Sequence, residues 1–333
     1  SNPVYTRTFM AIEEQAHELG YEIILAQTLN NPEREAACIR RLLARQVDGL
    51  FIRPVYRPNP NAAIYDELKK HKTPTVILGH RALFCSDFPN VETDDLAATE
   101  AATQHLLELG HKRIACFAGP TFAPWAQERF EGYRRALMEQ QIEVDENLIF
   151  HSGSTIQEGK AAALQLIDER PGATAILAAN DLVAIGAANV FLDSGVKIPD
   201  ELSIAGFGNI LTSEHYRVPL TTIRQPKFRM GMAAFDAMLK LINGERPEQE
   251  RIVGEVLGVI VGEGRVRRPL VLGHADYQGQ PVGVSGNGQP GRIQRREGSC
   301  HGRGNLASSQ DNGLFGFISP FVDGDDGDGI AIS

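Results

Sequence analysis

Short apolar runs alternate with stretches of helical periodicity along most of the chain. The apolar runs are rich in β-branched residues, as expected for strands buried on both faces of a parallel sheet. They lie at 22–27, 48–54, 75–79, 113–119, 173–179, 201–207 and 220–225. The clearest amphipathic stretches lie at 32–46, 95–110, 123–141 and 228–244. Strand–helix alternation of this kind predicts an α/β fold with parallel sheets and helices on both faces.

The first predicted element is a helix that precedes every predicted strand. Asn2 and Pro3 suit a helix entrance, because asparagine caps helices and proline is tolerated in their first turn. Gly20 ends this helix before the first apolar run. Its apolar face needs a sheet, but no strand of such a sheet comes before it in the sequence.

The number of strand–helix units predicts two lobes rather than one doubly wound domain. We place the first lobe at residues 1–111, completed by about 226–250, and the second at 112–225, completed by about 251–268. Apolar and polar residues alternate along 251–269, which predicts a last pair of strands there. Residues 270–333 are rich in glycine and lose the long periodicity, so we predict a disordered tail there.

Charge and composition argue against several classes of protein. The chain has 333 residues and a net charge of −9, which disfavours wrapping of nucleic acid by this stretch itself. No apolar run is long enough to span a membrane. The four cysteines form no CxxC pair and are expected to be reduced in a cytoplasmic protein.

Motif searches find no anchor for enzyme chemistry, a cofactor or a metal. The GxGxxG at 286–291 has no strand before it, and Pro290 disfavours a helix after it. The acidic stretch at 323–329 lacks the ligand register of an EF-hand. The sequence has no Walker A loop, HExxH or GxSxG motif, so we predict no catalytic residues, no metal and no cofactor.

Polar and aromatic residues collect just after the predicted strands, where open parallel sheets bind their ligands. Such groups suit the hydroxyls of a sugar or the edges of a base. The candidates are His80, Arg81, Trp125, Arg129, Asn180, Asp181, Asn209 and Gln225. Structural roles remain open for several of them: Asn180 and Asp181 as a helix cap, Trp125 as core, and Arg129 as a surface ion pair.

Five motifs, in order and spacing, resemble the lactose-repressor/galactose-repressor (LacI/GalR) family of bacterial transcription regulators. They are HLLELGHKRIACFAGP, RFEGYRRAL, AILAANDLVAIGA, VKIPDELSIAGFGN and PLTTIRQP. The resemblance runs from residue 1 to about 268. It implies a periplasmic-binding-protein-like type I fold with two Rossmann-like lobes and an effector in the cleft between them.

The resemblance also assigns roles to individual residues. Arg129 takes the place of the arginine that grips a sugar or purine, and Asn180 that of the amide in the AND motif. Tyr5 lies where an aromatic wall is usual, and Gln225 where a crossing strand lines the cleft. His80 departs from the common Asp-Arg pair, and Gly208-Asn209 replaces Asp-Asp, so the ligand cannot be named.

The function implied by the resemblance is a ligand-responsive regulator. A small polar effector such as a sugar would shift a homodimer between states of different DNA affinity. Operator DNA would be bound only through a helix-turn-helix head, which, with a hinge helix and the first core strand, we expect upstream of this sequence. The helix at 34–46 is a candidate dimer face or a solvated face.

Two other functions remain open at this stage. A secreted sugar-binding protein of a transporter shares the fold, and a nucleotide-dependent enzyme could use Rossmann-like lobes. The ELGHKRI and PLTTIRQP motifs favour the regulator.

Overall fold

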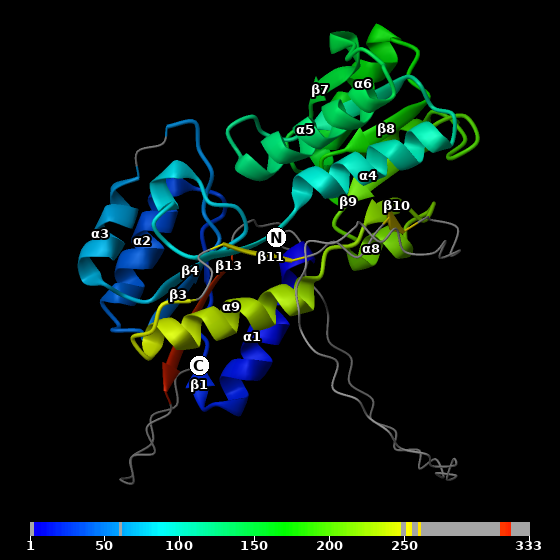
Figure 1. The fold of residues 1–333 in the computed structure, drawn as a ribbon. Coiled ribbons are helices and arrows are strands. Elements are labelled where there is room, and N and C mark those ends of the chain that lie inside the picture. The colour runs from blue at the N-terminus through cyan, green and yellow to red at the C-terminus, as the bar shows by residue number, and fades with distance from the viewer. Residues whose placement is uncertain (1–2, 60–61, 248–250, 255–258, 261–313, 321–333) are drawn as a thin grey trace, which may run out of the picture. The chain divides into compact units, whose positions relative to one another are not determined.

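The computed structural model describes residues 3–59, 62–247, 251–254, 259–260 and 314–320. Within these residues the strands form two sheets, each covered by helices (Figure 1). The helices that follow are α1 Thr6–Glu18, α2 Pro32–Leu43, α3 Ala63–His71, α4 Asp95–Glu108, α5 Pro124–Glu139, α6 Ile156–Glu169, α7 Asp181–Asp193, α8 Leu211–Glu214 and α9 Lys227–Ile242. Short 3-10 turns lie at Pro3–Tyr5, Leu83–Cys85 and Glu146–Leu148.

The first sheet runs in the order β1-β13-β3-β4-β5-β11, and β2 also pairs with β13. Its strands are β1 Tyr21–Glu22, β2 Ala26–Gln27, β3 Gly49–Ile52, β4 Thr75–Leu78, β5 Asn90–Thr93, β11 Arg251–Gly254 and β13 Leu314–Pro320. The block from β3 to β11 is parallel, whereas β13 pairs antiparallel with β1, β2 and β3. Gly316 of β13, for example, faces Phe51 of β3.

The second sheet runs in the order β12-β10-β9-β8-β6-β7 and is parallel except for β12. Its strands are β6 Ile114–Ala118, β7 Ile149–His151, β8 Ala175–Ala178, β9 Ser203–Phe207, β10 Thr221–Ile223 and β12 Val259–Ile260. β6 is the first strand of this sheet along the chain. The parallel α/β fold class predicted from the alternation is therefore confirmed.

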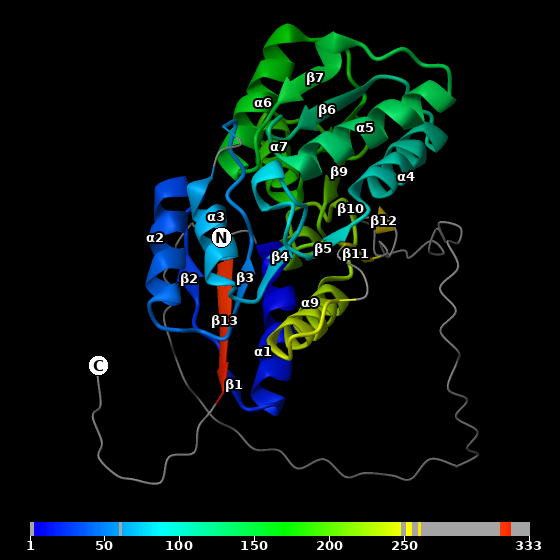
Figure 2. The same ribbon diagram turned by 60° about the vertical axis from the view of Figure 1, so that its left-hand side comes forward.

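Each sheet is buried on both faces. In β3, Leu50 and Ile52 pack with α2 and α3, whereas Phe51 packs on the other side with α1 and α9. Helices α1 and α9 lie side by side in both views of the fold (Figures 1 and 2). In the second sheet, α6 and α7 share one apolar cluster with the strands, and α4 and α5 share the other. Continuous burial explains why these strands read as unbroken apolar runs.

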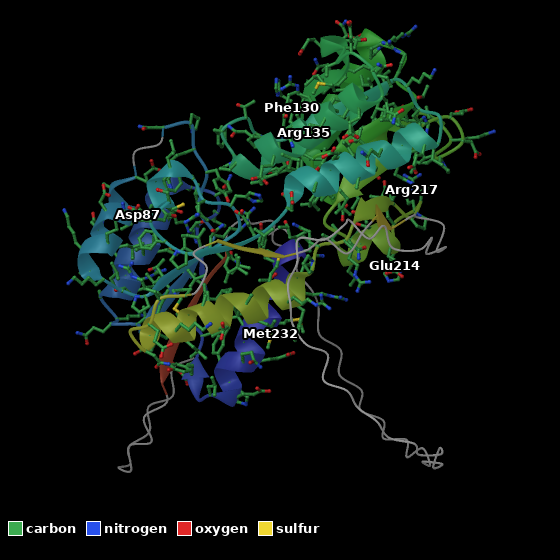
Figure 3. All side chains as sticks on the ribbon, in the orientation of Figure 1. Asp87, Phe130, Arg135, Glu214, Arg217 and Met232 are labelled. Carbon is green, nitrogen blue, oxygen red and sulfur yellow. The ribbon has the colours of Figure 1, made fainter. Side chains whose placement is uncertain are left out.

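The outer surfaces carry solvent-exposed ion pairs. Arg135 pairs with Glu131 along α5, and Arg217 pairs with Asp193 at the end of α7 (Figure 3). Such exposed pairs contribute little to stability. Across the described ranges, no helix combines the length and hydrophobicity needed to cross a bilayer.

Two predictions about the C-terminal region need correction. Residues 251–269 were expected to form one strand pair in the second lobe, but β11 joins the first sheet and only β12 joins the second. Residues 270–333 were expected to be disordered, yet residues 314–320 form β13 inside the first sheet. Both differences arise from long-range strand pairing, which local composition does not report. The rest of the predicted tail lies outside the described residues.

Candidate functional site

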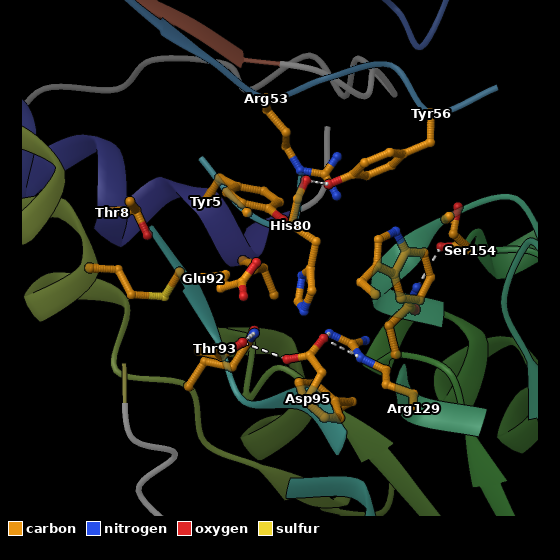
Figure 4. Close-up of a pocket in the computed structure, with 18 of the residues that line it drawn as sticks. Tyr5, Thr8, Arg53, Tyr56, His80, Glu92, Thr93, Asp95, Arg129 and Ser154 are labelled. Atoms are coloured by element: carbon orange, nitrogen blue, oxygen red, sulfur yellow. Dashed lines mark hydrogen bonds and ion pairs between the residues drawn. The ribbon is translucent and has the colours of Figure 1, made fainter. Parts of the chain in front are cut away.

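One pocket is lined by residues from both sheets, and it encloses about 1190 Å³ of empty space including its open mouth (Figure 4). The walls come from the segments that follow the carboxyl ends of several strands, as expected for an open parallel sheet. The early part of the chain contributes Tyr5, Arg53, Tyr56, His80, Glu92, Thr93 and Asp95. The later part contributes Phe122, Trp125, Arg129, Ser154, Asn180, Phe207, Gln225 and Lys227.

A buried arginine–aspartate pair forms the floor of this pocket. Arg129 of α5 donates from Nε to the carboxylate of Asp95 at 2.8 Å, and its Nη2 lies 2.7 Å from the same oxygen. Asp95 is 1% exposed in the first turn of α4, and it also accepts a hydrogen bond from the hydroxyl of Thr93. The Arg129 guanidinium stacks 3.4 Å from the Phe207 ring centroid. Its position is therefore fixed before any ligand arrives.

A second pair joins the segment after β4 to α5. His80 is buried, and its Nε2 lies 2.9 Å from a carboxylate oxygen of Glu128. Burial alone would lower the pKa of His80, but the hydrogen bond with Glu128 and the negative charge of Asp95 raise it above its ordinary value. The Tyr56 hydroxyl donates to the His80 carbonyl at 2.7 Å, which orients this segment.

His80, Glu92 and Glu128 also place three potential metal-ligand atoms within 4.8 Å of one another. These residue types can bind a divalent metal. His80 and Glu128 already form a hydrogen bond with each other, so these two side chains have polar partners within the protein. The sequence could not reveal it, because its members come from distant segments.

Two further cations line the pocket. Lys227, in the first turn of α9, donates to the Asn209 carbonyl at 2.7 Å, and burial lowers the pKa of this amine to about 8. Arg53 directly follows β3, and its guanidinium lies 4.2 Å from the Tyr5 ring centroid.

Six of the nine residues predicted for the site line this pocket: Tyr5, His80, Trp125, Arg129, Asn180 and Gln225. Gln225 donates to the Thr93 hydroxyl at 2.9 Å, which links the segment after β10 to β5. Asn180 caps α7 by accepting from the Val183 amide, which confirms the structural interpretation; it also lines the pocket, and its binding role stays a prediction. Ser1 and Asn2 lie outside the described residues.

The other three predicted residues are not among those that line the pocket. Asp181 is buried behind it and accepts hydrogen bonds from the Ile210 amide and the Ser213 and Thr222 hydroxyls. Asn209 supplies the carbonyl that Lys227 binds. Arg81 donates to the Ser86 carbonyl at 3.0 Å. These residues hold the surrounding loops in place.

Several residues that line the pocket were not predicted from the sequence. Arg53 was counted inside the predicted strand at 48–54, whereas β3 ends at Ile52 and Arg53 is the first residue after it. Glu92 and Thr93 were missed because β5 was not predicted. Its sequence, Asn-Val-Glu-Thr, is polar although all four residues are buried.

Residues 1–257 match the family model described as periplasmic binding proteins and sugar binding domain of LacI family. The chain belongs to the LacI family. The match covers both sheets up to β11 and confirms the resemblance inferred from the five motifs.

LacI-family regulators are also the curated relatives of this chain. It is 32% identical over 254 residues to the HTH-type transcriptional regulator DegA of Bacillus subtilis, covering 76% of this chain and 74% of that protein. It is 31% identical over 244 residues to the HTH-type transcriptional repressor CytR of Escherichia coli K12, covering 73% and 70% respectively. These relatives support the regulator over the transporter protein.

Solved LacI-family structures share the fold. A CelR–cellobiose complex aligns with a TM-score of 0.70 at 29% identity and covers 78% of each chain. CcpA of Lactococcus lactis aligns with a TM-score of 0.72 at 29% identity, covering 78% of this chain and 93% of that one. A LacI-family regulator from Enterococcus faecium with bound ribose aligns with a TM-score of 0.65 at 28% identity, covering 77% and 91%.

Proposed function

We propose that this chain is the effector-binding part of a LacI-family transcription regulator, and that the pocket in Figure 4 binds a sugar or related small polar molecule. The observation that carries the proposal is the wall of fixed charged and aromatic groups at the strand ends. Arg129 and Asp95 offer donors and acceptors to hydroxyl groups, and the Trp125 ring offers a face for stacking. Two structural neighbours, one in complex with cellobiose and one with bound ribose, support this class of effector.

The mechanism that follows is linkage between the pocket and DNA affinity. Two contacts, His80–Glu128 and Gln225–Thr93, already join distant segments across the pocket. A ligand that binds these segments better in one arrangement shifts the population toward it, by no more than its difference in affinity for the two states. A helix-turn-helix head would convert this shift into operator binding.

The remaining features of the proposal follow from family membership. Such a regulator acts in the cytoplasm as a homodimer, because paired heads read two half-sites of DNA. It performs no catalysis. The outer face of α2 is a solvated face rather than a dimer face in this proposal, because its apolar residues Cys38, Ile39 and Leu42 are buried in the core.

A thermal-shift screen tests the proposal. Ribose, glucose, galactose, cellobiose and their acid derivatives are added to the intact chain, and the melting temperature is recorded. A bound sugar at about 100 times its Kd stabilises the folded state by about 2.7 kcal/mol, which shifts the melting temperature measurably.

A variant of the pocket floor provides the control. Arg129→Lys keeps the charge beside Asp95 but loses the two-pronged donor geometry, so we expect a folded protein with weakened ligand stabilisation. A ligand shift of equal size in Arg129→Lys would remove this residue from the site. No shift with any member of the panel would contradict the proposed effector class.

A further inference from the structure

Arg53 stands apart from the other charged groups of the pocket. Its Nε is fully enclosed by protein and has no hydrogen-bond partner. Among the described residues, no carboxylate lies within the 4.0 Å ion-pair distance of its guanidinium. Its charge faces the phenol rings of Tyr5 and Tyr56 instead. Enclosing a charge without an opposite partner is costly, so the position favours a ligand that supplies one.

The other cations of the pocket are already engaged by groups of the protein. Arg129 is paired with Asp95, and His80 with Glu128. The Lys227 amine donates to a backbone carbonyl. Among the described residues that line the pocket, Arg53 is thus the guanidinium that has no carboxylate partner. Figure 4 shows its side chain reaching into the pocket beside Tyr56 and above His80.

We infer that the effector carries a carboxylate, and that Arg53 binds it in a two-pronged contact through its two Nη groups. A guanidinium matches a carboxylate in this end-on geometry, and Arg53 lines the pocket although its Nε is enclosed by protein. This inference deepens the proposed function, on which it rests: the effector is a sugar acid rather than a neutral sugar.

The acidic groups of the pocket limit the charge of the effector to a single negative charge. Glu92 and Asp95 line the same space, and each is a suitable acceptor for hydroxyl groups. A doubly charged phosphate ester would meet these carboxylates with only one unpaired guanidinium to offset them. A monocarboxylate with several hydroxyls matches both features.

Isothermal titration with matched pairs of sugars tests the inference. The intact chain is titrated with galacturonate and galactose, with glucuronate and glucose, and with glucose 6-phosphate. At least one acid is expected to bind about tenfold or more tightly than its neutral partner, as a charge-assisted pair provides. Arg53→Gln should lower the affinity for the sugar acid and so remove this preference. The affinity for the neutral sugar should change little.

Two matched variants complete the experiment. Arg53→Lys retains the positive charge but not the paired donors of a guanidinium. It should therefore keep part of the preference for the acid that Arg53→Gln loses. Arg45→Gln, at an exposed arginine outside the pocket, should bind like the unmodified chain. Equal loss of acid and neutral binding in Arg53→Gln would show a structural role and overturn the inference.

The outcomes separate this inference from the proposed function. Neutral sugars binding as tightly as their acids would overturn the carboxylate assignment but leave the sugar effector in place. Preferential binding of glucose 6-phosphate would overturn the single negative charge. Binding of none of these compounds at millimolar concentration would overturn both.

Discussion

At the scale of single residues, the pocket holds more buried charge than the fold requires. Arg53 lacks an opposite charge, and Asp95 depends on Arg129 alone for its ion pair among the described residues. Apolar residues of similar volume often stabilise a protein when they replace such groups. Binding sites commonly contain residues that lower stability, and this supports the binding roles proposed for Arg53 and Asp95.

Replacing Arg53 by methionine should therefore stabilise the ligand-free protein. Arg53→Met removes an enclosed charge while keeping most of the side-chain volume, and we expect the free energy of unfolding to rise by about 1 kcal/mol. Chemical denaturation of the variant and of the control Arg45→Met measures the difference. A clear loss of stability in Arg53→Met would mean that the arginine supports the fold.

His80 should make stability depend on pH. Its folded-state pKa is raised above the ordinary value of 6.5, so the protonated form is favoured in the folded state. The resulting stabilisation is fully present below about pH 6.5 and is lost as the pH rises through the folded-state pKa. Glu128, Asp95 and Glu92 are the acidic groups that act on it.

The measurement compares His80→Gln with the unmodified chain. Melting temperatures recorded from about pH 6 to pH 8 should decline less steeply in the variant, because the raised titration is removed. His151→Gln, at an exposed histidine, serves as the control. Parallel pH profiles for His80→Gln and the unmodified chain would contradict the role of the His80–Glu128 pair.

At the scale of elements, the apolar pattern predicted most of the architecture. The six apolar runs from 48–54 to 220–225 all contain strands, and the four clearest amphipathic stretches all contain helices. The first run, 22–27, forms two separate short strands instead of one. β5 was missed because three of its four buried residues are polar, and two of these, Glu92 and Thr93, line the pocket. Sequence patterns fail where function overrides packing.

Close contacts between helices depend on glycine, which the sequence pattern did not reveal. A Cβ at Gly186 of α7 would overlap the backbone carbonyl of Ile156 in α6, and a Cβ at Gly159 of α6 would overlap that of Val183 in α7. The two helices thus approach through facing glycines. Alanine is intrinsically a better helix former than glycine. Whether a glycine-to-alanine substitution here raises or lowers stability therefore tests whether the two helices are in close contact.

Gly186→Ala should destabilise the protein by about 2 kcal/mol, because overpacking outweighs the helix propensity gained. Denaturation midpoints give the comparison. Gly20→Ala is a useful reference, since Gly20 has no atom within 4 Å of an added Cβ and only its left-handed backbone opposes alanine. This reference should cost about 1 kcal/mol. Stabilisation by Gly186→Ala would contradict the close helix packing.

At the scale of the whole molecule, the site depends on pairings that no local pattern reports. Arg129 meets Asp95 across 34 positions, and Gln225 meets Thr93 across 132. Arg129 and Gln225 were predicted at the site from their positions after predicted strands and from the family resemblance, but their partners Asp95 and Thr93 were not. The antiparallel place of β13 in the first sheet was equally unpredictable from its composition.

Membership of the LacI family connects the pocket to regulation. The family match spans both sheets, and the relatives are transcription regulators. The central claim is that an effector binds among the fixed groups around Arg129 and Arg53 and biases the arrangement of the two sheets.

A crystal structure of the intact chain with the most stabilising sugar or sugar acid of the screen tests this claim most directly. We predict a ligand within hydrogen-bond distance of Arg129, with its carboxylate on Arg53 and its hydroxyls near Asp95 or Glu92. A ligand bound elsewhere, with these side chains unoccupied, would contradict the account.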